Sequence, residues 1–198
     1  WKRILTPARL TEILENYAQI VEEVNPKTGK KKQVQIFPRY HQLEVVRQTL
    51  ADVLAHGAGK RYLIQHSAGS GKSNSIAWLA HQLIGLKKGE ATVFDSIIVV
   101  TDRRILDQQI RDTIKQFAQV GATVGHAEGS GDLRRFIEGG KKIIITLASK
   151  IADRSPEKTF TVGSVRGNAV ITPLTSSSVQ IRATARVPFC NSRLAEFA

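Results

Sequence analysis

The stretch Tyr62-Leu-Ile-Gln-His-Ser-Ala-Gly-Ser-Gly-Lys-Ser73 decides the fold of this 198-residue chain. The apolar run from Tyr62 to Ile64 predicts a short strand, and a helical pattern follows from Asn74 to Leu86. Between them lies a loop of small residues, in which glycine lets successive backbone N–H groups turn into one concavity. Because the following helix adds the positive end of its dipole, the order strand, loop, helix predicts a phosphate-binding site.

The side chains of this loop suit a nucleoside triphosphate with Mg²⁺. Lys72 can reach the β- and γ-phosphates, and the hydroxyl of Ser73 is placed to hold the metal. The usual pattern G-x-x-x-x-G-K-[ST] has one departure, because His66 replaces its first glycine. The alternative is a Gly/Ser-rich turn that only resembles a phosphate loop. We expect the nucleotide to contact Ser67, Ala68, Gly69, Ser70, Gly71, Lys72 and Ser73.

Composition points to a polyanionic partner. The formal net charge is +12, which favours nucleic acid, although a generally basic protein is the alternative. Cys190 is the single cysteine, so neither a disulfide within the chain nor a zinc cluster is expected. We expect a cytoplasmic protein without a membrane span, because no apolar run is long enough and no signal peptide pattern is present. The chain begins at Trp1 without any methionine, so we interpret it as a piece of something larger.

The region before the loop predicts two helices. Apolar residues recur three and four apart from Leu10 to Val24, which predicts one amphipathic helix that starts at Pro7 and stops at the turn Asn25-Pro-Lys-Thr-Gly29. Lys30, Lys31 and Lys32 follow, and we expect a solvated loop there, with a specific contact as the alternative. A second helix is expected from Arg39, with Gly57 to Gly59 closing it.

After the loop, buried strands alternate with helices. Ser96 to Thr101 and Ile143 to Thr146 are continuous apolar runs, as expected for strands covered on both faces, and a helix is predicted from about Leu106 to Phe117. This alternation predicts an α/β fold with a parallel sheet flanked by helices. After Ile151 no periodic run survives, so we expect residues 151–198 to be irregular or disordered.

Two further groups of residues are candidates for function. Gln42 lies thirty residues before Lys72, and its amide could read the edge of an adenine. Thr101, Asp102, Arg103 and Thr146 are expected at the carboxyl edge of the sheet, where ligands of such folds bind. For Asp102, the alternative to a ligand contact is a role as a helix cap or in a local ion pair.

These residues resemble the motifs of superfamily 2 helicases. Pro38-Arg-Tyr-His-Gln42 is similar to the adenine-reading Q-motif, Gln65 to Ser73 to motif I, and Val99-Val-Thr-Asp-Arg103 to motif Ia. The exact sequence of these motifs, including His66, resembles that of the restriction subunit of type I restriction–modification enzymes. The likeness covers roughly residues 1–150.

The resemblance implies an ATP-driven translocase and endonuclease of double-stranded DNA that assembles with modification and specificity subunits. Residues 38–150 would be part of its first RecA-like motor domain, after an N-terminal helix and basic linker in 1–37 and before an aberrant tail in 151–198. By position, Arg39 and Gln42 would contact the ATP. Thr101, Asp102, Arg103 and Thr146 would contact DNA.

One motif of that family is missing. The family writes an acidic pair, Asp-Glu-Ala-His, on the strand after Thr146, yet no aspartate in this chain is followed by glutamate. Because such a pair holds Mg²⁺ and positions water, we expect this chain to bind ATP weakly and to hydrolyse it at no useful rate. The tail after Thr146 could be foreign or frame-shifted. A nucleotide kinase, a non-enzymatic nucleic-acid-binding module and an inert truncated product are the alternatives.

Overall fold

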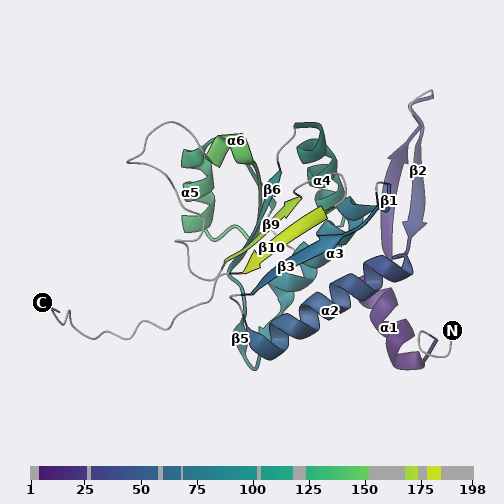
Figure 1. The fold of residues 1–198 in the computed structure, drawn as a ribbon. Coiled ribbons are helices and arrows are strands. Elements are labelled where there is room, and N and C mark those ends of the chain that lie inside the picture. The colour runs from purple at the N-terminus through teal and green to yellow at the C-terminus, as the bar shows by residue number, and fades with distance from the viewer. Residues whose placement is uncertain are drawn as a thin grey trace, which may run out of the picture.

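A computed structural model gives the fold (Figure 1) and describes residues 5–25, 28–57, 60–67, 69–101, 104–117, 124–151, 168–173 and 178–183. Its helices are α1 (Pro7–Asn16), α2 (Tyr40–His56), α3 (Lys72–Gly85), α4 (Arg104–Gln116), α5 (Ser130–Glu138) and α6 (Ala148–Ile151). Its strands are β1 (Gln19–Val24), β2 (Lys31–Ile36), β3 (Arg61–Gln65), β4 (Lys87–Lys88), β5 (Ala91–Thr92), β6 (Ser96–Thr101), β7 (Val124–Ala127), β8 (Ile143–Leu147), β9 (Asn168–Pro173) and β10 (Ser178–Ala183).

The main sheet has the strand order β3-β10-β9-β6-β8-β7. Strands β9, β6, β8 and β7 pair in parallel, whereas β10 runs antiparallel to both β9 and β3. Strand β3 therefore points the same way as the parallel strands, and its carboxyl end lies at the edge where β6 and β8 also end. The α/β fold with a parallel sheet flanked by helices is confirmed, and the arrangement is that of an incomplete RecA-like domain.

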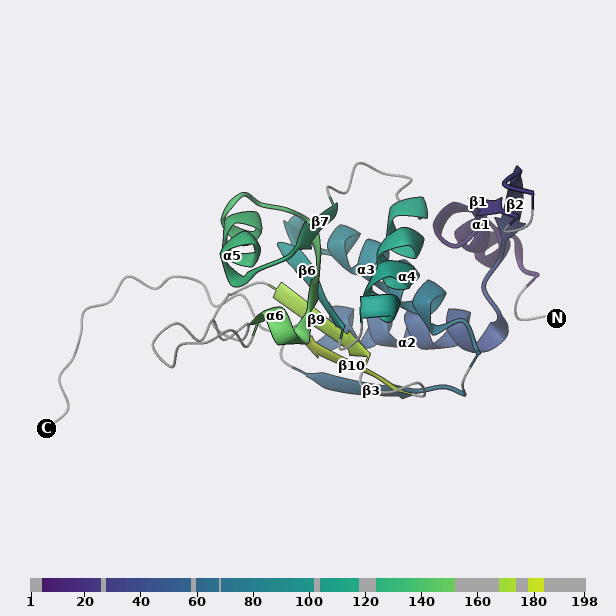
Figure 2. The ribbon, with the colours of Figure 1, turned by 90° about the horizontal axis from the view of Figure 1, so that it is seen from above.

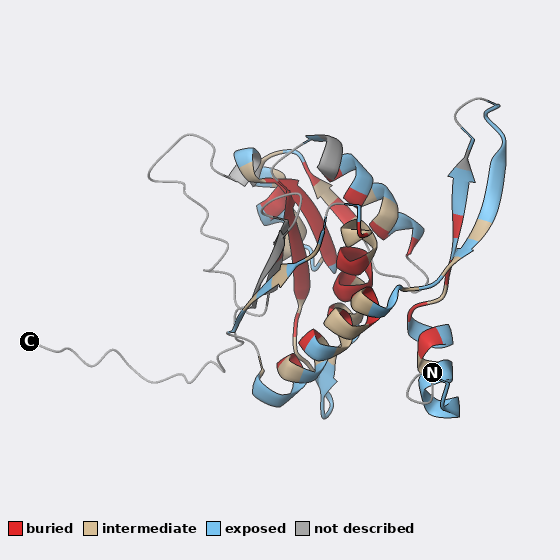
Figure 3. Cartoon of the chain, turned by 45° about the vertical axis from the view of Figure 1, so that its right-hand side comes forward, coloured by how far each residue is buried: buried red, intermediate tan, exposed pale blue. Residues whose placement is uncertain are grey.

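Helices cover both faces of the sheet (Figure 2). Strands β6 and β8 are buried along their whole length, as their continuous isoleucine and valine runs predicted. On one face, Ile97 and Ile145 pack in a large cluster with α2, α3 and α4. On the other face, Ile98 and Ile144 pack against α5 and α6. The buried strands form the centre of the molecule in Figure 3, which places the core between these layers.

The predicted N-terminal helix is wrong in its second half. Helix α1 ends at Asn16, and β1 pairs antiparallel with β2 in a hairpin that stands away from the main sheet (Figure 1). Side-chain alternation explains the strand, because Val21 is buried while Ile20 is 60% exposed. The lysine run belongs partly to β2, where Lys31 bonds to Glu22 across 3.1 Å. The loop expected there is therefore wrong for Lys31 and Lys32, whereas the expected exposure of the three lysines to solvent is confirmed.

The N-terminal segment nevertheless packs on the body of the molecule. Trp78 of α3 is 1% exposed, and its Nε1–H donates to the carbonyl oxygen of Tyr17 across 2.9 Å. Arg47 of α2 makes two hydrogen bonds to the carboxylate of Glu12, of 2.9 and 2.6 Å. The proposed division of the chain at residues 37 and 150 stays a prediction.

The expectation of irregular structure after Ile151 is wrong for two segments. Residues 168–173 form β9 beside β6, and residues 178–183 form β10 between β9 and β3. Ile171 is completely buried in the core of the sheet. Short β-prone runs gain hydrogen-bonding partners there that their own sequence does not reveal. The remainder of 151–198, apart from Ile151, lies outside the described residues.

Candidate nucleotide-binding site

The loop between β3 and α3 has the backbone geometry that a phosphate site needs. Gly69 and Gly71 have φ of +72° and +79°, the left-handed region that favours glycine. Helix α3 begins at Lys72, so the N–H groups of Lys72 and Ser73 have no helical acceptor, whereas those of Asn74 and Ser75 donate to the carbonyl oxygen of Gly71. A Cβ added at Gly69 would meet nothing within 4 Å, so the loop has free space on that side.

The side chains of the loop supply positive charge and hydroxyls. Lys72 is half-buried, and its Nζ donates to the carbonyl oxygen of Ser67 across 2.8 Å, so the ammonium lies against the loop. Ser73 is half-buried on the first turn of α3. Ser70 is 6% exposed, and its Oγ has no partner among the described residues. Ala68, also expected in the site, lies outside the described residues.

Gln42 lies against this loop, although 28 or more residues separate it from the loop in the chain. Its side-chain Nε2 donates to the carbonyl oxygens of Ser70 and Gly71, across 3.1 and 2.9 Å, and the residue is 3% exposed. Its Oε1 accepts from the backbone N–H of Arg39 across 2.8 Å. The amide is thus fully engaged with protein and joins the start of α2 to the phosphate loop. Adenine reading by Gln42 and contact by the exposed Arg39 stay predictions.

A pair of histidines adds a second connection between α2 and the loop. His41 and His66 meet edge to face, with ring centroids 5.0 Å apart and planes at 83°. Nε2–H of His41 also donates to the carbonyl oxygen of Ser70 across 3.2 Å. The pKa of His66 is lowered, first by burial and then by the neighbouring His41 and Lys72. His66, the departure from the usual motif, therefore packs as a largely neutral ring.

The residues present fit a polyphosphate, and they fit a metal only in part. An ammonium, free helix N–H groups and the orphaned Ser70 hydroxyl are all suited to phosphate oxygens. For Mg²⁺ the loop offers serine hydroxyls, with Ser73 on the first turn of α3, but no carboxylate. Within the described ranges, no group of three or more His, Cys, Asp or Glu side chains could hold a metal ion.

The rim of β6, β8 and β7 contains a buried polar network. Thr101 Oγ1 donates to Oδ1 of Asp107 across 2.9 Å, and Nε2–H of His126 donates to Oδ2 across 2.8 Å. Asp107 is 4% exposed and lies in the first turn of α4. Thr146 Oγ1 donates to the carbonyl oxygen of Ala127. One carboxylate therefore joins β6, α4 and β7 at the edge that also carries the phosphate loop.

Two of the residues expected to contact DNA, Thr101 and Thr146, belong to this buried network. Thr101 and Thr146 are at the predicted edge, but they are 0% and 1% exposed and their hydroxyls donate to internal acceptors. Their side chains hold the sheet edge together and do not face solvent. Asp102 and Arg103 lie outside the described residues, so their contact with DNA stays a prediction.

Sequence reasoning missed Asp107, His126 and the pairing of His41 with His66. An aspartate in the first turn of a helix is common, because it interacts favourably with the helix dipole. Its position in the sequence therefore did not indicate that Asp107 bonds to Thr101 and His126. His126 follows a stretch without strong periodicity. The histidine pair is 25 residues apart, so only the packing of α2 on the loop reveals it.

Fold and site together define an ATP-binding, helicase-like motor of superfamily 2. A family model described as SWI2/SNF2 ATPase matches residues 41–179, which is more than half of the chain. The chain belongs to this family. The match begins beside Gln42 and ends at the start of β10, so it covers the loop, the network and the other five strands of the main sheet. A search of curated proteins found no match. Among the described residues, no helix is long and apolar enough to cross a membrane.

Proposed function

We propose that this chain is the nucleotide-binding part of an ATP-dependent DNA translocase, the motor of a type I restriction subunit. It binds ATP through Ser67–Ser73, with Lys72 on the β- and γ-phosphates and Ser73 on Mg²⁺. The observation that carries this proposal is the loop itself: two left-handed glycines before a helix N-terminus, with Lys72 held against the loop. The sequence of the motifs supports the assignment to the restriction subunit in particular. The net charge of +12 supports DNA as the partner.

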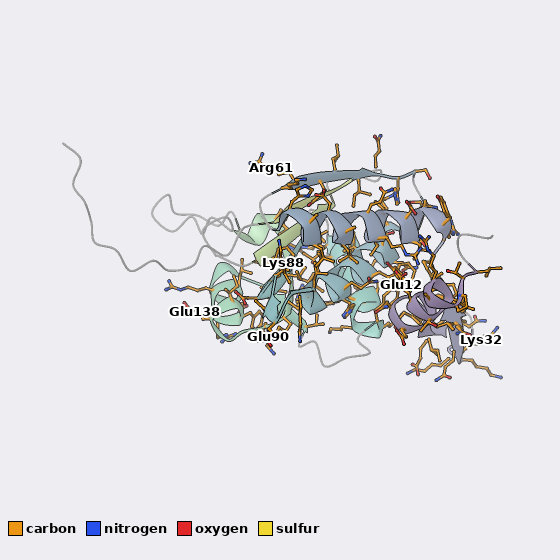
Figure 4. The ribbon with its side chains drawn as sticks, turned by 90° about the horizontal axis from the view of Figure 1, so that it is seen from below. Glu12, Lys32, Arg61, Lys88, Glu90 and Glu138 are labelled. Atoms are coloured by element: carbon orange, nitrogen blue, oxygen red, sulfur yellow. The ribbon has the colours of Figure 1, made fainter. Side chains whose placement is uncertain are left out.

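Binding of a fluorescent ATP analogue with Mg²⁺ tests the site. We expect saturable binding to the wild-type chain and at least a tenfold loss in Lys72→Ala. Lys88→Ala is the matched control, because Lys88 is an exposed lysine on β4 (Figure 4), which follows the C-terminal end of α3, whereas the loop precedes the N-terminal end of that helix. Salt-sensitive DNA binding should survive Lys72→Ala. Equal loss of DNA binding would instead favour a loop that holds DNA phosphate.

Hydrolysis is expected to be negligible in this chain. In the part of the chain that the structure describes, the next strand after β8 is β9, which reads Asn-Ala-Val-Ile-Thr-Pro and carries no carboxylate. A motor needs an acidic residue there to hold Mg²⁺ and position water. Phosphate release should therefore not rise above background when DNA is added. Turnover of roughly one per second or more, the ordinary range of enzymes, would show that another carboxylate does this work.

The restriction assignment has its own test. A longer protein that contains this chain should co-purify with modification and specificity subunits and cleave DNA in an ATP-dependent way. The same assembly with Lys72→Ala should bind DNA but not cleave it. A stable motor that shows no affinity for those subunits would overturn the restriction assignment and leave the ATP site untouched.

A further inference from the structure

His66 stands where the usual phosphate-loop pattern has its first glycine, and the function proposed above does not use its ring. The residue directly follows β3 and is half-buried. Unlike glycine, histidine can gain and lose a proton near neutral pH. A titratable group therefore lies at the start of the loop that would hold the phosphates.

Two other basic side chains lie close to the ring of His66. His41 of α2 meets it edge to face, with ring centroids 5.0 Å apart. Lys72 lines the same small cavity as His66, a space of about 10 Å³ bounded by β3, α2 and α3. The Nζ of Lys72 also donates to the carbonyl oxygen of Ser67 in the loop. Three side chains that can carry positive charge therefore gather at one phosphate loop.

These surroundings disfavour the charged form of His66. Burial of the ring lowers its pKa most, and His41 of α2 and Lys72 of α3 lower it further. Among the described residues, no carboxylate acts on the ring to offset them. Nδ1 is buried without a hydrogen-bond partner in the same part of the chain, so an imidazolium would carry an N–H there that has no acceptor.

A bound polyphosphate opposes one of these causes. The ammonium of Lys72 acts on His66 through space, so phosphate oxygens held by that ammonium act on the ring as well, with the opposite sign. The pKa of His66 should therefore rise when a polyphosphate binds. A group whose pKa rises on binding takes up protons, and the ligand in turn binds more tightly where the protonated form is favoured.

We propose that nucleoside triphosphate binding at this loop is coupled to proton uptake by His66, so that the ligand binds more tightly as pH falls below neutral. The coupling rests on the nucleotide site proposed above. Its pH window lies between the lowered pKa of His66 in the free protein and the higher pKa in the complex. Above the window both forms are neutral and below it both are protonated, so the affinity changes only inside it.

Calorimetric titration of the full chain with adenylyl imidodiphosphate and Mg²⁺ tests the coupling. Titrations at about pH 6 in two buffers of different ionisation enthalpy give the number of protons taken up per nucleotide. We expect roughly 0.3–0.5 more protons for wild type than for His66→Gln, a difference that removes protons bound by the nucleotide itself. Between about pH 7.5 and 6, the affinity of wild type should rise roughly threefold more than that of His66→Gln, since a pKa shift of one unit limits the change to about tenfold.

His81→Gln is the matched control. Burial also lowers the pKa of His81, but its ring bonds to the carbonyl oxygen of Ile114 and does not line the cavity beside the loop. This variant should keep the proton uptake of wild type. His41→Gln separates the two neighbouring rings and should keep most of the uptake. If His66→Gln fails to fold, His66→Gly, which restores the usual glycine, takes its place.

Equal proton uptake by wild type and a folded His66 variant would overturn the coupling and leave the nucleotide site in place. Loss of uptake in His41→Gln, with full uptake in His66→Gln, would assign the proton to His41 and also overturn the proposal. No saturable binding at either pH would overturn the nucleotide site itself, and the coupling with it. The two failures are therefore distinguishable.

Discussion

The side-chain amide of Gln42 donates to the carbonyl oxygen of Gly71 across 2.9 Å, and this bond joins the first turn of α2 to the phosphate loop. The approach is so close that a Cβ on Gly71 would lie 2.5 Å from the amide nitrogen. A glutamine expected to read adenine is therefore also a support of the loop that would hold the phosphates.

Gln42→Leu should destabilise the protein and weaken nucleotide binding. The change removes the partner of the Arg39 N–H and of two carbonyl oxygens, so we expect the free energy of unfolding to fall by about 2–3 kcal/mol. Gln48→Leu on the exposed side of α2 is the control. Urea denaturation measures the loss. ATP and GTP affinities separate the roles: a loop support weakens both equally, whereas an adenine reader loses preference for ATP.

Gly71→Ala should cost clearly more than Gly69→Ala. Both glycines have positive φ, which costs alanine roughly 1–2 kcal/mol. Only at Gly71 does the new methyl group also collide with Gln42, since nothing lies within 4 Å of a Cβ at Gly69. Thermal unfolding of both variants measures the difference. If Gln42→Ala does not reduce the cost of Gly71→Ala in a double-mutant cycle, the proposed collision is wrong.

Asp107→Ala should lower the free energy of unfolding more than the same substitution at an exposed aspartate. The substitution leaves two buried donors, the Thr101 hydroxyl and the His126 N–H, without their acceptor. We therefore expect the free energy of unfolding to fall by about 2–4 kcal/mol. Asp107→Asn, which keeps one acceptor, should lose less. Asp112→Ala, exposed on the same helix, should stay within about 0.5 kcal/mol of wild type. A similar loss in both alanine variants would contradict a special role for Asp107.

Stability should fall as pH drops below neutral. The pKa values of His66 and His81 are lowered from 6.5, mainly by burial, so the unfolded chain binds more protons than the folded one between 6.5 and those lowered values. Their contribution is complete above 6.5 and is lost as pH decreases through that window. Denaturation at pH 7.5 and 5.5 measures the slope. His66→Gly should reduce it, and a double variant with His81→Gln should reduce it further.

The sequence by itself determined the local features of the nucleotide site. Tyr62 to Ser73 specifies a strand, a loop and a helix, because glycine, lysine and serine at that spacing are typical of a phosphate-binding loop. The positive φ of Gly69 and Gly71 agrees with this prediction. The long apolar runs of β6 and β8 likewise indicate buried parallel strands, because a strand covered on both faces has no polar side. These inferences need only neighbours in the chain.

Only the tertiary structure decided what distant residues do. The apolar positions from Tyr17 to Val24 fit a helical spacing, yet pairing with β2 makes Gln19–Val24 a strand. The β-prone runs in β9 and β10 become strands because β6 and β3 offer them hydrogen-bonding edges. The buried Thr101 hydroxyl donates to Asp107, whose other carboxylate oxygen accepts from His126 nineteen residues further on, and the amide of Gln42 donates to carbonyl oxygens of the loop. The physical reason is common to all of them: a hydrogen-bond partner many residues away leaves no periodic signal in the sequence.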